Sequence, residues 1–360
     1  MPILSICIPT YNRSSCLAEL LDSIIAQNVP EIEVIVSDDG SSDDTGEVAQ
    51  GYGRRIANFT YLRQPINIGV DRNVAAVTAA ATGDYLWLVG DDDRLERGGV
   101  RRVMDALERW PGVAALTVGV IDYDVTMRQI TGVRGMPETQ CLTGAGVVFS
   151  RVGELLGYIS ATIVNRRKWE TAAAEPNARS MKNLYSPVYI AGRAVGTDGT
   201  WGIVKEPCVG FRSGNDQLKR RVGWLERLKI DVRAYDEIAD LLFASDPSAR
   251  RAMATRVFNT HVVARILNAK TEGEGGRDKI AAAAYLIGRY PGVPRLWTLA
   301  LPMLFAPCGA VRTTRRIYQR MVNSSGKSRA RQLVFDRDRM DKQSCDRAMI
   351  PTARPGNSQA

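Results

Sequence analysis

The sequence predicts an α/β protein with a mostly parallel, doubly wound sheet and flanking helices, followed by a helical C-terminal region. Two observations predict this fold class. In the first ninety residues, short apolar runs alternate with segments of helical apolar spacing, which is the pattern of successive strand-helix units. From about residue 220 onward, the spacing of apolar residues is helical. Ligands of doubly wound sheets bind at the carboxyl ends of the strands, so functional residues are expected there.

The first strand-helix units are predicted at residues 4–9 with 14–25, and at residues 33–37 with a helix beginning near Thr45. The run 4–9 is apolar and ends at a proline, which suits a buried parallel strand that opens into a loop. Leucines and isoleucines then recur at helical spacing behind serines, which cap helices. The Asp, Gly and Ser residues before Thr45 favour a turn and a helix start.

Two acidic clusters follow predicted strands. Residues 59–62 predict a third strand, 72–81 an alanine-rich helix and 85–89 a fourth strand. The second strand runs into Asp38-Asp39 and the fourth into residues 91–93, which are three aspartates. Because the carboxyl ends of parallel strands share one edge of a sheet, both clusters are expected on one rim.

Residues 113–215 are expected to be mixed strand and loop, with strands at 113–118, 157–164 and 201–204. Helices are expected beyond them. Their ranges are 225–243, 252–269 and 278–289.

The apolar stretch 293–307 is too short and too interrupted by proline to predict a membrane span. An interfacial segment fits it better, with 312–320 as an adjacent basic helix facing anionic headgroups. A pair of core helices is the alternative. The polar residues 324–360 are expected to be disordered.

Charge and cysteine usage narrow the function classes. The net charge is +9, and much of the excess lies after residue 310. The arginines there follow an apolar stretch without interleaved stacking aromatics, which argues against nucleic acid as a partner. The six cysteines form no CxxC pair, and no signal peptide precedes the first apolar run, so reduced thiols in the cytoplasm are expected.

Asp91, Asp92 and Asp93 repel one another unless a cation lies among them. Mg²⁺ or Mn²⁺ resolves this repulsion, because these hard ions bind one or two carboxylates together with phosphate oxygens and water. A solvated turn with a helix cap is the alternative, and the triplet alone does not separate the two.

Five blocks within the first 110 residues together resemble the family 2 glycosyltransferases, in family order and spacing. The family has the GT-A fold, which is Rossmann-like. The blocks are Ser5–Arg13, Val36–Ser41, Asn67–Gly69 with Asn73, Gly83–Tyr85 and Asp91–Asp93. The forms of 67–73, 87–90 and 163–166 are similar to the branch that contains bacterial O-antigen abequosyltransferases.

The resemblance implies a nucleotide-sugar site. Asp39 would accept a hydrogen bond from a base N–H, and uracil, thymine and guanine all offer one, so the nucleotide stays open. Arg72 would pair with the diphosphate or with Asp91, at a helix N-terminus that favours anions; a surface arginine is the alternative. Asp91 itself would face the ribose or Arg72. The remaining residues expected at the donor are Pro9, Thr10 and Tyr11, which form the wall under the base, with Arg13 and Asn67.

The resemblance also implies Mn²⁺ or Mg²⁺ as cofactor. The family motif is Asp-x-Asp-Asp, and Gly90 replaces its first acid here. Asp92 then takes the place of the metal ligand, with Asp93 as a second ligand, a helper or a helix cap. The metal would neutralise charge on the leaving nucleoside diphosphate.

Inverting members of the family use an acid about a hundred residues further on as general base. Asp198 is the single carboxylate of residues 185–200 and is the candidate, although a loop carboxylate before Gly199 is the plainer interpretation.

The sequence therefore predicts an inverting hexosyl- or deoxyhexosyltransferase that uses a nucleotide-diphosphate sugar. Its acceptor would be a lipid-linked glycan or polysaccharide of the cell surface, such as O-antigen or exopolysaccharide, at the inner face of the plasma membrane. A degenerate nucleotide-sugar-binding scaffold is the alternative. The expected organisation is a catalytic domain at 1–215, with a nucleotide-sugar half at 1–110 and an acceptor half at 111–215. A membrane-proximal helical region at 216–323 and the tail follow.

Overall fold

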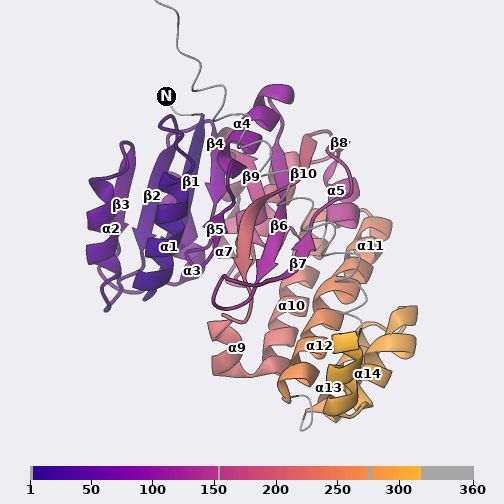
Figure 1. Ribbon diagram of the computed structural model, residues 1–360. Coiled ribbons are helices and arrows are strands. Elements are labelled where there is room, and N and C mark those ends of the chain that lie inside the picture. Colours follow the sequence, from indigo (N-terminus) through magenta and orange to yellow (C-terminus); the bar gives the residue numbers. More distant parts are fainter. Residues whose placement is uncertain (1–2, 153–154, 275–277, 318–360) are drawn as a thin grey trace, which may run out of the picture.

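The computed structural model describes residues 3–152, 155–274 and 278–317. The expected tail at 324–360 and the basic residue Arg320 lie outside this part of the chain. Within it, a long sheet with flanking helices occupies residues 4–212, and helices follow from Gln217 onward (Figure 1). The predicted fold class, a mostly parallel α/β sheet with a helical C-terminal region, is confirmed.

Four parallel strands form the N-terminal half of the sheet, in the order β3-β2-β1-β4. β1 and β2 are almost completely buried, as strands covered on both faces are. Thr10 pairs with Asp38, so β1 and β2 end level with each other. The bounds are β1 (Leu4–Thr10), β2 (Glu33–Asp38), β3 (Phe59–Arg63) and β4 (Tyr85–Leu88).

The sheet continues through β9 (Thr162–Asn165), which runs antiparallel to both β4 and β6. β6 (Ala115–Tyr123) therefore points the same way as β4, and the long β10 (Thr200–Arg212) is parallel to β6. The carboxyl ends of β1, β2, β4, β6 and β10 consequently share one edge. The short antiparallel strands are β5 (Arg94–Leu95), β7 (Ile130–Arg134) and β8 (Gln140–Thr143).

Helices cover the sheet in the order that the sequence pattern predicts for the first half. α1 (Ser14–Ile25) buries its leucine and isoleucine stripe in the main core. α3 (Val70–Ala79) packs on β1 and β2, and α4 (Gly99–Arg109) packs on β10. α2 (Thr45–Gly53) contacts α1 and β3.

The expectation of strand and loop between 113 and 215 is wrong in part, because four helices lie there. α8 is buried along nearly all of its length, with Arg193 as its one exposed residue, so it has too few polar residues to reveal a helix. The expected strand at 157–164 begins only at Thr162, after a single turn of 3-10 helix. The helices are α5 (Ala145–Val152), α6 (Arg166–Ala173), α7 (Pro176–Ser180) and α8 (Ser186–Val195).

The C-terminal helices surround a second apolar core that includes Trp224, Phe258 and Leu286. The first half of α10 (Trp224–Leu242) belongs to this core, while its second half packs into the main core. α10 thus joins the two cores, and the domain boundary expected after residue 215 stays a prediction. The other helices here are α9 (Gln217–Val222), α11 (Pro247–Val257), α12 (Val263–Glu272), α13 (Lys279–Arg289) and α14 (Leu301–Phe305).

In the described part of the chain, no single helix is long and apolar enough to cross a membrane. The helical segments Leu296–Phe305 and Cys308–Ile317 meet the length and composition of a span only when taken together, and they are bent by 119°. Leu296, Ala300 and Leu304 are buried in the second core, whereas Trp297 and Phe305 are each 51% exposed. The segment expected to be either interfacial or core therefore has one buried and one exposed side.

Candidate active site

The two acidic clusters lie on one rim of the sheet and are joined through Thr10. The Thr10 hydroxyl donates to Oδ2 of Asp91 (2.7 Å), and the backbone N–H of Asp39 donates to the carbonyl of Thr10 (2.9 Å). The strand order β2-β1-β4 places Thr10 between the two clusters. The expectation that both clusters meet at one rim is confirmed.

Asp39 holds the start of α3 against this rim. Its carboxylate is 3% exposed and accepts hydrogen bonds from the backbone N–H groups of Ile68 (2.7 Å) and Gly69 (3.0 Å). Gly69 has a φ of 88°, which glycine adopts without steric cost, and the helix N-terminus favours the negative charge. Each carboxylate oxygen has a second lone pair, so these contacts leave room for a base N–H.

Arg13 bridges the first two acids of the run. Its Nη1 lies 3.3 Å from Oδ1 of Asp91 and forms an ion pair with Oδ2 of Asp92. Burial raises the pKa of the Asp91 carboxyl to about 6, although Arg13 acts in the opposite direction. Arg13 is thus a cation that the protein itself places between Asp91 and Asp92, and the expected divalent ion stays a prediction.

Asp93 is the most enclosed of the three acids, at 2% exposure. Its Oδ2 accepts from the hydroxyl of Ser160 (2.6 Å), and its Oδ1 accepts from the backbone N–H of Arg212 (3.4 Å). Burial, and then the charge of Asp92, raise the pKa of the Asp93 carboxyl to about 7. Ser160 also accepts from the backbone N–H of Gly90 (2.8 Å), so it holds both ends of the acidic turn.

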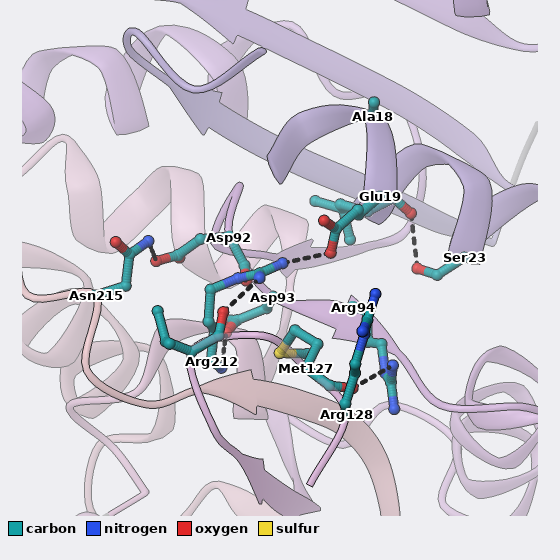
Figure 2. Close-up of polar contacts among 12 residues, drawn as sticks. Ala18, Glu19, Ser23, Asp92, Asp93, Arg94, Met127, Arg128, Arg212 and Asn215 are labelled. Atoms are coloured by element: carbon teal, nitrogen blue, oxygen red, sulfur yellow. Dashed lines mark hydrogen bonds and ion pairs between the residues drawn. The ribbon is translucent and has the colours of Figure 1, made fainter. Parts of the chain in front are cut away.

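Arg212 and Asn215 belong to the site although sequence reasoning missed them. Figure 2 shows Arg212 between the acidic run and α1: its guanidinium donates to the carbonyl of Asp92 (2.9 Å) and to the carboxylate of Glu19 (2.6 Å). Asn215 donates to Oδ2 of Asp92 (2.7 Å). The sequence places them at and just after the end of a strand, where functional residues are expected. That they contact Asp92, however, follows only from the order of the strands in the sheet.

The residues fit a divalent ion held by one carboxylate, not an all-protein cage. Among the described residues, no group of three or more His, Cys, Asp or Glu side chains is placed to hold a metal. Both oxygens of Asp93 are engaged, whereas the Asp92 side chain is 21% exposed and faces Arg13 and Asn215. Mg²⁺ and Mn²⁺ commonly bind through one or two carboxylates plus phosphate oxygens, which suits Asp92.

The other residues expected to bind the donor sugar nucleotide differ in how far their side chains are exposed. Thr10 is buried, Pro9 half-buried, and Tyr11 43% exposed, as a ring that contacts a ligand needs to be. Asn67 and Arg72 are exposed. Arg72 forms no ion pair with Asp91 in the described structure, so its side chain remains free to meet a diphosphate.

The structure does not bring Asp198 to the site. Asp198 precedes the first residue of β10, whereas Arg212 at the last residue contacts the acidic run. The 13 residues of β10 span about 40 Å at roughly 3.3 Å per residue. Asp198 therefore lies at the opposite edge of the sheet, and a general base there could not reach a sugar bound at Asp92.

Residues 5–145 match the family model described as glycosyl transferase family 2. Abequosyltransferase RfbV of Salmonella typhimurium is 29% identical over 269 residues, which are 69% of this chain and 78% of that protein. The GalNAc(5)-diNAcBac-PP-undecaprenol beta-1,3-glucosyltransferase of Campylobacter jejuni is 36% identical over 105 residues, which are 29% of this chain and 34% of that protein. The chain thus spans most of the first relative and about a third of the second.

A solved structure of S. aureus TarS 1-349 in complex with UDP-GlcNAc has the same fold. The TM-score is 0.56 at 16% sequence identity, and the match covers 91% of this chain and 92% of that one. The likeness extends beyond the family match into the C-terminal helices.

Proposed function

We propose that this chain, a glycosyltransferase with a family 2 domain at residues 5–145, transfers a sugar from a nucleotide-diphosphate sugar to a lipid-linked or polysaccharide acceptor of the cell surface. One observation carries the proposal: Asp39 and the acidic run share one rim and are joined through Thr10. A base at Asp39 and a diphosphate at Asp92 would then be held at two points of the same edge.

The donor is proposed to lie along this rim. Tyr11 offers an exposed ring for the base, and Asp39 offers free lone pairs to a base N–H. Arg72 and the N-terminus of α3 favour an anion between them and the acidic run. The relative of the same fold was solved with UDP-GlcNAc, which supports a nucleoside diphosphate sugar without naming the nucleotide here.

Asp92 is the proposed ligand of Mn²⁺ or Mg²⁺, while Asp93, the other expected ligand, has both oxygens engaged and is proposed as the helper that holds the acidic turn. When bound, such an ion neutralises charge on the leaving diphosphate. Arg13 contacts Asp92 and is the cationic side chain that would turn towards the phosphates. The transfer is proposed to invert the anomeric centre, which NMR of the product would test: retention of configuration would contradict it.

The test compares the variant Asp92→Asn with the control variant Asp240→Asn. Asp240 is 71% exposed and forms a surface ion pair near the end of α10. Metal-dependent donor hydrolysis is measured for UDP-, GDP- and dTDP-sugars, together with nucleotide binding by calorimetry. We expect hydrolysis to fall by a factor on the order of 100 in Asp92→Asn, as for loss of a charge-stabilising group, and to be unchanged in Asp240→Asn. Undiminished hydrolysis in a folded Asp92→Asn would reject the metal role.

The C-terminal helices are proposed to dock on the inner face of the membrane. Trp297, Phe305 and Ile317 are each about half exposed (51–52%), in a segment that carries basic residues. Apolar and basic side chains together favour an anionic lipid interface. The name of the Campylobacter relative contains PP-undecaprenol, a lipid, which is consistent with this position.

Vesicle co-sedimentation at low salt tests the docking. The double variant Trp297→Ser, Phe305→Ser should lose most binding to vesicles of anionic lipid, while Ile130→Ser, at an exposed apolar side chain of β7, should bind like the wild type. Equal binding of both variants would count against docking through this segment.

A further inference from the structure

A groove of about 730 Å³ runs between α3 and the segment α6–α8, beside the proposed donor site. Its volume lies in the range of about 300–1,000 Å³ that is usual for small-molecule sites. Apolar side chains form both walls: Val74, Ala75 and Ala79 on one side, and Trp169, Ala173 and Ala178 on the other. Of the residues proposed above for the donor, Arg72 lines the groove, and none of those proposed for the base or the metal does.

The groove begins at the active rim. Gly69 and Asp71 line the end of the groove next to the rim. The backbone N–H of Gly69 donates a hydrogen bond to Asp39. Asp71 in turn joins the opposite wall, since it accepts from the hydroxyl of Ser186 (2.8 Å). A ligand that enters the groove from the rim would therefore start next to the donor diphosphate.

The polarity of the groove changes along its length. Arg72 lies in the first turn of α3, at the end of the groove next to the rim. Lys182 lies near the same end, because the backbone N–H of the nearby Leu184 donates to Asp71 (3.3 Å). From Arg72 to Ala79 the helix advances about 10 Å at 1.5 Å per residue, and its residues facing the groove there are Val, Ala and Thr. One end is thus charged and the rest is mainly apolar.

The charges of the groove are unbalanced toward positive. Within the described chain, the side chains of Arg72, Arg179 and Lys182 form no ion pair or hydrogen bond, and all three are exposed. The two acids of the lining are already engaged: Asp71 by Ser186, and Glu170 by Arg166 at 2.6 Å. With Arg72 at the donor end, Arg179 and Lys182 remain as free cations beside apolar walls, and this combination is complementary to an amphiphilic anion.

We propose that this groove binds the diphosphate and first isoprenoid units of a polyprenyl-diphosphate-linked acceptor. The proposal rests on the proposed function and specifies its acceptor. The acceptor diphosphate lies at Arg179 and Lys182, beside the Arg72 of the proposed donor site, and the isoprenoid chain follows α3 toward Ala79. A neutral polysaccharide acceptor would use neither the cations nor the apolar walls.

Farnesyl diphosphate is the probe, titrated calorimetrically below its micelle concentration into the full-length protein. We expect saturable binding to the wild type. The double variant Arg179→Gln, Lys182→Gln should bind at least about tenfold more weakly, because charge-assisted contacts are lost. Ala75→Phe fills the apolar part from an exposed helix position, where the fold tolerates it, and should weaken binding to a similar degree.

Two matched controls lie on α6 outside the groove: Arg167→Gln and Thr171→Phe, both at exposed positions, should bind farnesyl diphosphate like the wild type. Inorganic diphosphate and farnesol should each bind more weakly than the joined molecule. Inorganic diphosphate binding as tightly as farnesyl diphosphate would overturn the proposal in favour of a simple anion site. Unchanged affinity in the groove variants, or no binding to the wild type, would overturn it as well.

Nucleotide binding and donor hydrolysis separate this proposal from the proposed function. The groove variants should retain both, because their side chains line the acceptor groove and not the donor rim. A protein that hydrolyses donor but ignores farnesyl diphosphate would lose only the acceptor proposal. A protein that binds farnesyl diphosphate in the groove but neither binds nor hydrolyses any donor would lose only the proposed function.

Discussion

Arg13 neutralises the acidic run at the place where a divalent ion is expected. It contacts Asp91 and Asp92, and its side chain is 16% exposed. An ion at Asp92 and the guanidinium of Arg13 are therefore alternatives for the same carboxylate. Phosphate oxygens of a bound donor would favour the ion, because Mg²⁺ and Mn²⁺ bind carboxylates together with phosphate oxygens.

Replacement of Arg13 by Met should lower the free energy of unfolding by about 2 kcal/mol, because two partly buried carboxylates lose their cation. Mn²⁺ without nucleotide should then raise the melting temperature of Arg13→Met more than that of the wild type. Thermal denaturation with and without Mn²⁺ measures both effects. Arg55→Met is the control: its ion pair with Asp22 is more than half exposed and should contribute little. Equal Mn²⁺ responses would show that Arg13 does not compete with the ion.

At the scale of elements, the junction of α11 and α12 is a π-helical turn, Phe258–Val262. The sequence pattern predicts one uninterrupted helix here, and the extra residue of the turn is not visible in it. The turn aims His261 at α10, where its Nε2 lies 3.1 Å from the hydroxyl of Tyr235. Burial lowers the pKa of the His261 imidazole to about 4.

This lowered pKa predicts a loss of stability in acid. Between pH 6.5 and pH 4 the unfolded chain binds a proton at His261 that the folded chain does not, so stability falls as the pH is lowered through this window. At pH 5 the loss from this residue should be about 1–2 kcal/mol. Urea denaturation of the wild type and of His261→Gln at pH 7.5 and pH 5 isolates the contribution of His261 to the free energy of unfolding. The other titrating groups are common to both proteins. The expectation fails if both proteins lose the same stability.

At the scale of the whole molecule, Asp231 connects the C-terminal helices to the groove between α3 and the segment α6–α8. It is completely buried on α10 and accepts from the hydroxyl of Tyr185 (2.6 Å) and from Nε of Arg265 (2.8 Å). Arg227 pairs with the same carboxylate. Tyr185 directly precedes α8 at the end of the groove wall, so this network fixes the wall against the helical region.

Asp231→Ala should cost about 3–5 kcal/mol, because it leaves two arginines without their buried partner. Asp240→Ala, in an exposed ion pair on the same helix, should change stability by less than about 0.5 kcal/mol. Urea denaturation measures both. Because Tyr185 loses its acceptor in Asp231→Ala, adding Tyr185→Phe to that variant should cost less than Tyr185→Phe costs alone. Additive costs would show that the two residues act separately.

The first half of the fold could be predicted because its signals are local. Apolar runs, turn residues and helical spacing around residues 4–89 are each contained in a few consecutive residues, and they also place Asp39 and Asp92 at strand ends. Among the helices of 145–195, α8 was missed for a physical reason. It is buried except at Arg193, so its sequence has too few polar residues for a helical period to be recognised.

The sequence by itself determined the α/β class, the shared rim of the two acidic clusters and the resemblance to a family. Only the tertiary structure decided which distant residues complete the site. Arg212 and Asn215 reach Asp92 across about 120 residues, and Asp198 is carried away from it by the length and direction of β10. Local patterns record which residues form a strand, but the edge at which a residue lies depends on strand order and direction, and those are set by long-range packing.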